Sequence, residues 1–175
     1  MSRGRIHLYC GEGKGKTTAA MGLAARAAGQ GTPVIIVQFL KARTSAELKT
    51  LALSPHIHIV EGPEEVKFTF AMSEEEKAAF SAVYQRMFRQ AAELCRREPV
   101  GLLVLDEAVG ALDKGMLFWE ETAKFLHSRP KGLEVVFTGR NPSPELMELA
   151  DYITEMKKLR HPFDRGESAR CGIEF

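Results

Sequence analysis

Glycine and lysine alternate in a short segment close to the N-terminus. The segment consists of Gly11, Glu12, Gly13, Lys14, Gly15, Lys16, Thr17 and Thr18. Glycines allow backbone N–H groups to converge on an anion, and the first turn of a following helix adds partial positive charge. In such a loop Lys16 would reach the phosphates of a nucleotide and the Thr17 hydroxyl would bind Mg²⁺. The segment therefore predicts a nucleotide site, with a plain glycine turn before a helix as the alternative.

The glycine spacing departs from the usual phosphate-loop pattern, G-x-x-x-x-G-K-[ST]. If Gly15, Lys16 and Thr17 form its end, the first glycine should stand at position 10. Cys10 occupies that position, and the glycine comes one residue later, at Gly11. The loop is therefore a damaged nucleotide site, a chance resemblance, or a loop that holds ATP in a different way.

Two adjacent carboxylates, Asp106 and Glu107, follow an apolar run far downstream of the loop. Phosphate-loop proteins hold Mg²⁺ partly through an Asp at the end of a separate apolar strand. The alternative is a carboxylate that caps a helix where a strand ends. Taken with the loop, the acidic pair predicts a site in which Thr17, Asp106 and Glu107 surround Mg²⁺ or Mn²⁺.

Alternating strands and helices would position these residues. Strands are expected over Arg5–Cys10, Pro33–Leu40, His56–Gly62, Gly101–Ala108, Leu133–Gly139 and residues 152–156. Helices are expected over residues 16–31, from the cap Ser73 to about Arg97, over Gly115–Ser128 and from Pro144 onward. Ser73 and Glu76 have the spacing of a capping box. This alternation predicts an α/β fold, a three-layer sandwich whose mostly parallel sheet carries helices on both faces.

Composition restricts the classes of protein to which the chain can belong. Its 175 residues, 45% of them hydrophobic, suit a single domain over 1–175. A net charge of +1 argues against a broad electrostatic surface for nucleic acid or membrane. The three cysteines show no metal-site spacing and are typical of reduced thiols in a cytoplasmic protein. From the residues alone, the prediction ends at a protein that binds a nucleoside triphosphate with Mg²⁺.

The loop and the C-terminal half together resemble the ATP:corrinoid adenosyltransferases of the phosphate-loop type. The matching segments are GEGKGKTTAAMGLAARAAGQG, VIIVQFLK, LLVLDE, VVFTGRNPSPELMELAD, ITEMK and HPFDRGESARCGIEF, in order along nearly the whole chain. The loop form, the TGRN turn and the tail are specific in combination. The resemblance implies a RecA-like phosphate-loop NTPase fold, a homodimer, ATP as co-substrate, a corrinoid as substrate, and a flavoprotein or other reductant that supplies Co(I).

The reaction that the resemblance implies needs no nucleophile from the protein. A Co(I) corrinoid attacks C5′ of ATP, and the whole triphosphate leaves. Positioning and stabilisation of the departing charge remain for the protein, and Lys14, Lys16, the loop N–H groups and Mg²⁺ suit that work. The resemblance also implies that ATP lies reversed in the loop, with C5′ facing outward. The late Gly11 then belongs to the loop form of the family.

Two further groups of residues match the family. Phe68, Thr69 and Phe70 correspond to its FTW stretch, for which the resemblance implies an apolar wall that keeps the lower axial ligand away from cobalt. The alternative is one face of a strand that packs on the core. Arg140 and Asn141 follow a strand end, where open parallel sheets bind ligands, so they contact nucleotide or corrinoid or simply form a turn.

Two other functions remain open beside adenosyl transfer. A plain phosphate-loop ATPase or kinase would need the same loop and acidic pair and would produce ADP. A binding module without catalysis would hold both ATP and corrinoid and convert neither.

Overall fold

A parallel six-stranded sheet forms the centre of the protein. The computed structural model describes residues 3–41, 45–66 and 72–173. The strands are β1 (Ile6–Cys10), β2 (Val34–Gln38), β3 (Ile57–Ile59), β4 (Leu102–Asp106), β5 (Glu134–Thr138) and β6 (Tyr152–Glu155). They lie in the order β3-β2-β4-β5-β1-β6, and each pairing among the described residues is parallel. The predicted α/β class with a mostly parallel sheet is confirmed.

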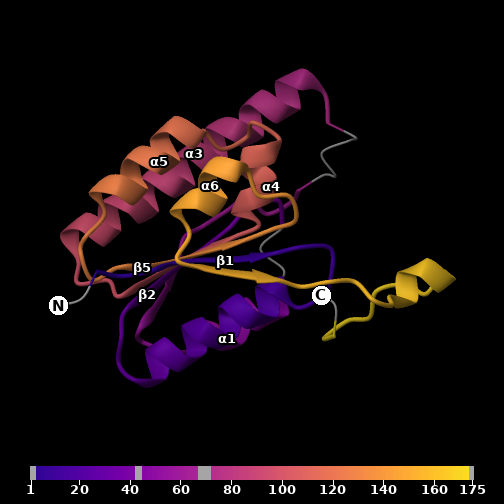
Figure 1. Ribbon diagram of the computed structural model, residues 1–175, viewed down its shortest axis with the longest axis horizontal. Helices are drawn as coiled ribbons and strands as arrows, with labels where there is room; N and C mark the ends of the chain where they lie inside the picture. The colour runs from indigo at the N-terminus through magenta and orange to yellow at the C-terminus, as the bar shows by residue number, and fades with distance from the viewer. Residues whose placement is uncertain (1–2, 42–44, 67–71, 174–175) are drawn as a thin grey trace.

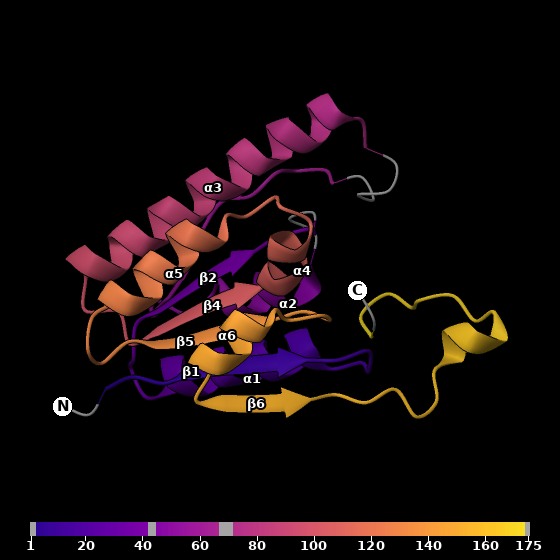
Figure 2. The same ribbon diagram turned by 45° about the horizontal axis from the view of Figure 1, so that its top comes forward.

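Helices cover both faces of this sheet, as Figures 1 and 2 show. They are α1 (Lys16–Gly29), α2 (Ala46–Leu51), α3 (Glu74–Arg97), α4 (Ala108–Asp113), α5 (Trp119–Ser128) and α6 (Pro144–Leu149), with a 3₁₀ turn at Pro162–Arg165. One core cluster joins α1 and α2 to the sheet, and the other joins α3, α4, α5 and α6 to its opposite face. The result is the predicted three-layer sandwich. In the described part of the chain, no helix has the length and hydropathy of a membrane span.

The continuous apolar runs of the sequence follow from this double cover. In β2, Val34 and Ile36 belong to the core beneath α1, whereas Ile35 and Val37 belong to the core beneath α3. Successive side chains of a strand point to opposite faces, so a strand covered on both faces is apolar along its length, and in β2 and β4 only the last residues, Gln38 and Asp106, are polar. Both β2 and β4 are buried along their whole length.

Small side chains allow α1 to lie close to the sheet. Its buried residues include Ala20, Ala24 and Ala28, which stand four positions apart on one face of the helix. This packing fixes the first turn of α1, which begins at Lys16, directly beyond the end of β1. At α3 both halves of the predicted capping box form, because the Ser73 hydroxyl accepts from the Glu76 N–H and the Glu76 carboxylate accepts from the Ser73 N–H.

The helices differ from the prediction in two places. The helix expected over Gly115–Ser128 begins at Trp119, and a separate short helix, α4, precedes it. Gly115 has φ +64° and stands just after α4, where a left-handed glycine ends a helix rather than starting one. The short helix α2 was not predicted at all.

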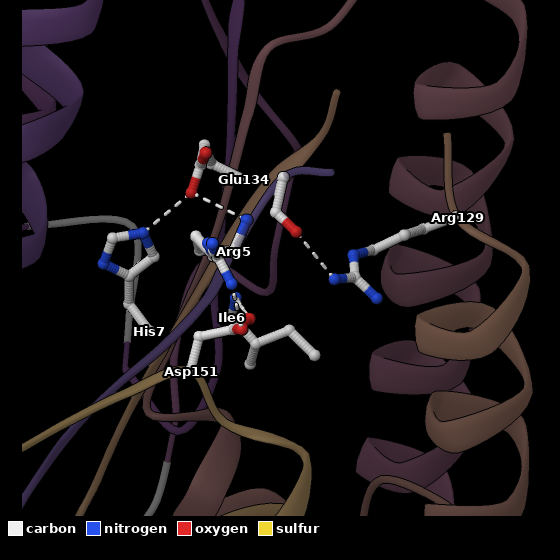
Figure 3. A network of polar contacts seen from close by, with 7 residues as sticks. Arg5, Ile6, His7, Arg129, Glu134 and Asp151 are labelled. Carbon is white, nitrogen blue, oxygen red and sulfur yellow. Dashed lines mark hydrogen bonds and ion pairs between the residues drawn. The ribbon is translucent and has the colours of Figure 1, made fainter. Parts of the chain in front are cut away.

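The two ends of the described chain lie at opposite ends of the strands, although β1 and β6 are neighbours in the sheet (Figure 2). Polar contacts near the start of β1 join it to β5 and to the segment before β6 (Figure 3). After β6 the chain extends beyond the carboxyl ends of the strands and turns back toward them (Figures 1 and 2). The C-terminal segment therefore lies on the side of the sheet where the glycine loop emerges.

Candidate functional site

The glycine loop begins one residue after the buried end of β1. Cys10 is the last strand residue, with 6% of its surface exposed, and its carbonyl accepts a hydrogen bond from the Met156 N–H. The chain turns at Gly11, which has φ +96°, and enters α1 through Gly15, which has φ +111°. Position 10 thus belongs to the core of the sheet, and the turn needs its first glycine at position 11.

Lys16 points back into the loop. Its ammonium donates to the carbonyl oxygens of Gly11 at 2.7 Å and Gly13 at 2.8 Å. Burial lowers the pKa of Lys16, and the nearby carboxylate of Glu107 opposes that effect. A largely buried ammonium held by the carbonyls of an anion-binding loop is well placed for exchange onto phosphate oxygens.

A pocket of about 710 Å³ opens beside the loop. Its polar lining includes Lys14, Lys16, Thr17, Thr18, Lys41 and Glu107. Gly172 and Ile173 of the C-terminal segment contribute to the same lining. With Glu47 also in its lining, the pocket combines a loop at a helix N-terminus, three ammonium groups and two carboxylates, a composition suited to a polyphosphate with a cation.

Asp106 forms the centre of a buried polar cluster at the end of β4. Its side chain is 0% exposed. Oδ1 accepts a hydrogen bond from the Thr138 hydroxyl at 2.7 Å, and Oδ2 accepts from Gln38 Nε2 at 2.9 Å and from Lys41 Nζ at 2.9 Å. The Lys41 ammonium also donates to Thr17 Oγ1 at 2.8 Å. Strand β4 is thereby connected to the first turn of α1 through one lysine side chain.

Glu107 follows in an unusual backbone conformation. Its φ is +57°, and its N–H donates to the Thr138 hydroxyl at 2.8 Å. Burial raises the pKa of the Glu107 carboxyl, while the Lys41 ammonium opposes the shift. Left-handed backbone at a non-glycine residue costs free energy and is frequent at functional sites. The bend turns Glu107 toward the pocket that it lines.

The oxygens of Thr17 and Asp106 suit a divalent cation. Both already lie within 2.9 Å of one ammonium nitrogen, so they converge on a single positive charge. Carboxylate and hydroxyl oxygens are the ligands that Mg²⁺ prefers, usually completed by water and substrate phosphates. Gln38 Oε1 is a further buried acceptor without a partner among the described residues. Among the residues that the structure describes, no three or more His, Cys, Asp or Glu side chains lie together in a way that could hold a metal ion.

The structure gathers some of the predicted residues and separates others. The loop residues Lys14 to Thr18 share one pocket with Glu107, and Asp106 lies behind it. Arg140 and Asn141 line a neighbouring pocket of about 310 Å³ with Glu12 and Glu107. There the Arg140 guanidinium pairs with Glu12 at 3.2 Å, and the Arg140 carbonyl accepts from the Gly11 N–H at 3.3 Å. Residues 68–70, the predicted apolar wall, lie outside the described residues.

Three residues of the cluster were not predicted as part of the site: Lys41, Gln38 and Thr138. All three stand at or just after the carboxyl end of a strand, which is where open parallel sheets bind ligands. Polar residues at the ends of apolar runs are the sequence signal that could have identified them.

Comparison with known proteins decides the family. Residues 2–175 match the family model described as ATP:corrinoid adenosyltransferase BtuR/CobO/CobP. The chain belongs to this family of ATP:corrinoid adenosyltransferases. The predicted resemblance is confirmed over the whole chain, and the late first glycine is part of a complete family match.

Individual relatives agree with this assignment. The chain is 34% identical to a corrinoid adenosyltransferase of Pseudomonas aeruginosa, over 99% of this chain and 84% of the relative. The identity is also 34% with corrinoid adenosyltransferases of Escherichia coli K12 and Salmonella typhimurium, over 99% of this chain and 86% of each relative. Among solved structures, a KaiC-like protein from Pyrococcus horikoshii OT3 has a TM-score of 0.53 and 17% identity, with 91% of this chain and 75% of that chain covered. That likeness concerns the fold alone.

Proposed function

We propose that this adenosyltransferase-family protein transfers the 5′-deoxyadenosyl group of ATP to the Co(I) centre of a corrinoid and releases triphosphate. The observation that carries the proposal is the late-glycine loop, Gly11–Lys16, which opens onto a pocket of about 710 Å³ in a chain that matches the family over residues 2–175. We infer a role in adenosylcobalamin synthesis or salvage.

The proposed chemistry asks the protein for position and charge. Co(I) supplies the electron pair for the new Co–C bond, and the C5′–O bond breaks with its electron pair on the departing triphosphate. The chain therefore provides no base or nucleophile. Lys14, Lys16 and the N-terminus of α1 are placed to hold the triphosphate and to stabilise its charge as it leaves. We assign Thr18 to the same phosphate contacts.

We assign the divalent cation, Mg²⁺ or Mn²⁺, to Thr17 and Asp106, with Glu107 close by. Support comes from the convergence of the Thr17 hydroxyl and the Asp106 carboxylate on one positive charge. When bound, such an ion neutralises phosphate charge and so favours departure of the triphosphate. Gln38 and Thr138 orient the Asp106 carboxylate, because each donates a hydrogen bond to one of its two oxygens.

The corrinoid contacts are also part of the proposal. We assign the apolar wall to Phe68, Thr69 and Phe70, on the strength of their match to the family stretch. We assign nucleotide or corrinoid contacts to Arg140 and Asn141, which line the pocket next to the loop. For Phe70→Ala we expect slow adenosylation from Co(II) with a reductase and normal adenosylation from chemically reduced Co(I). Equal rates for variant and wild type from Co(II) would remove the wall assignment.

We further propose a single domain over 1–175, a cytoplasmic location, a homodimer, and a flavoprotein or other reductant that delivers Co(I). Light scattering during size-exclusion chromatography tests the homodimer through the molar mass of the eluted particle. A mass equal to one chain at micromolar concentration would contradict it.

One incubation separates adenosyl transfer from the other functions. The protein is mixed with ATP, Mg²⁺ and chemically reduced cob(I)alamin, and both products are measured. We expect a light-sensitive alkyl-cobalt spectrum and intact triphosphate in equal amounts, with Lys16→Ala as the inactive control. Release of ADP or phosphate without adenosylcobalamin would indicate an ATPase or kinase. Binding of both ligands without products would indicate a binding module.

A further inference from the structure

A lysine ammonium lies between the two oxygens assigned to the metal. Lys41 Nζ is 2.8 Å from Thr17 Oγ1 and 2.9 Å from Asp106 Oδ2. Lys41 stands three residues after the end of β2, on a different element from either partner. Its ammonium thus bridges a helix N-terminus and a strand end, the same two elements that a bound divalent cation would connect.

Lys41 and Asp106 differ in how far their side chains are exposed to solvent. The Asp106 side chain is 0% exposed, whereas 31% of the Lys41 side chain remains exposed and lines the large pocket. A buried carboxylate needs positive charge as well as hydrogen bonds, because an uncompensated buried charge is strongly destabilising. Gln38 and Thr138 contribute neutral donors to Asp106, and Lys41 contributes the charge.

We propose that Lys41 is a resident cation, which occupies the metal position of the nucleotide-free protein and gives it up when a divalent cation arrives with ATP. This inference rests on the metal site of the proposed function. Two cations that share the same pair of oxygens repel each other strongly at such short range, so the ammonium and the metal exclude one another.

The proposal determines the order in which ligands bind. Free metal ion finds the Thr17 and Asp106 oxygens already neutralised, so the nucleotide-free protein binds it weakly. A triphosphate in the pocket supplies several negative charges for the displaced ammonium. The Lys41 ammonium can move from Asp106 to the phosphate oxygens, because its flexible four-carbon side chain is partly exposed on the pocket wall. Metal and nucleotide therefore enter together.

Metal binding without nucleotide or corrinoid tests the proposal independently of adenosyl transfer. Mn²⁺ is titrated into wild type, Lys41→Met and Lys49→Met, and binding is followed by electron paramagnetic resonance and by thermal unfolding. Lys49 is the control, since it is an exposed lysine on the neighbouring helix α2. We expect Lys41→Met to bind Mn²⁺ more tightly than wild type by on the order of tenfold or more. Its melting temperature should be low without metal and rise with Mn²⁺.

Two results would overturn the proposal. One is equal Mn²⁺ affinity in wild type and Lys41→Met, which would make Lys41 a permanent structural ion pair. The other needs no variant: wild type that binds Mn²⁺ as tightly alone as with ATP would show that no resident cation competes. If Lys41→Met does not fold, this second comparison still decides the question. Both Mn²⁺ measurements can be made even if the protein does not transfer an adenosyl group. A failure of the proposed function is therefore distinguishable from a failure of the Lys41 proposal.

Discussion

The Thr138 hydroxyl connects the two carboxylate residues of the site. It donates to Asp106 Oδ1 at 2.7 Å and accepts from the Glu107 N–H at 2.8 Å, and the residue is fully buried. A hydroxyl can donate and accept at the same time, which no aliphatic side chain of this shape can do. Thr138 therefore holds both the carboxylate of Asp106 and the left-handed turn at Glu107.

Replacing the Thr138 hydroxyl with a methyl group hardly changes the side-chain volume but should still destabilise the protein. We expect Thr138→Val to lower the free energy of unfolding by about 1–3 kcal/mol, since it leaves a buried Asp106 oxygen and the partly buried Glu107 N–H without these partners. Thr138→Ser keeps the hydroxyl and loses one methyl group, which costs about 1 kcal/mol. Urea denaturation of both variants measures the difference. A valine variant as stable as the serine variant would contradict this role of the hydroxyl.

The sequence predicted the residues that bear local signals and missed those that depend on register. Lys16 and Thr17 belong to a recognisable loop, and Asp106 ends an apolar run. Gln38 reaches Asp106 because β2 and β4 pair with these two residues in register. Neither strand contains information about its partner, so this contact could not be predicted without the sheet.

At the scale of elements, the glycine loop is packed against the chain that leaves β6. The Gly13 N–H donates to the Met156 carbonyl oxygen, and the Met156 N–H donates to the Cys10 carbonyl oxygen at 2.8 Å. A Cβ atom at Gly13 would lie 2.5 Å from the Met156 carbonyl oxygen, closer than any real contact. The loop and the start of the C-terminal segment therefore fit together only with glycine at position 13.

Gly13→Ala should therefore displace one of these two backbone segments. We expect a loss of about 1–3 kcal/mol in the free energy of unfolding and a higher KM for ATP, because overpacking against rigid backbone forces a shift. Gly22→Ala is the matched control. Its added methyl group meets no atom within 4 Å on the exposed side of α1, so it should stabilise the helix by about 0.5–1 kcal/mol. Equal behaviour of the two variants would contradict the tight contact.

The long helix after Ser73 was predicted well and the six-residue α6 was found from its Pro144 start, but two other short helices were not predicted as separate elements. The helix from Ser73 to Arg97 has a cap and several turns of pattern, and its predicted limits agree with α3. The helices α2 and α4 contain six residues each, too few to show a helical period. Tertiary packing stabilises such short helices, and Leu48 and Leu51 of α2 are indeed buried beside α1.

At the scale of the whole molecule, a polar network fastens the first strand to the last part of the sheet (Figure 3). The Asp151 carboxylate, just before β6, accepts from the Arg5 guanidinium at 2.8 Å and from the Ile6 N–H at 2.9 Å. The Glu134 carboxylate of β5 accepts from the Arg5 N–H at 3.0 Å and lies 2.9 Å from His7 Nε2. These contacts join residues more than 120 positions apart, so they act only in the complete fold.

Acid should weaken this connection through Asp151. The Ile6 N–H, followed by the Arg5 guanidinium, lowers the pKa of the Asp151 carboxyl below its usual value. A carboxylate whose pKa is lower in the folded state stabilises the protein above the unfolded pKa of about 3.9, and this contribution disappears as pH falls through the folded value.

We expect Asp151→Asn to be less stable than wild type by about 1 kcal/mol at pH 7, since the pair is partly screened by solvent. The difference should shrink as pH falls below the unfolded value and through the lowered folded pKa of Asp151, because the wild-type carboxylate then takes up a proton. Urea denaturation at a series of pH values from 7 into acid measures this difference in the free energy of unfolding. Glu93→Gln, at an exposed position on α3, is the control for loss of one charge. A stability difference that stayed constant from pH 7 down to the acid unfolding of the protein would mean that Asp151 acts through packing, and the charged connection between the first and last strands would be wrong.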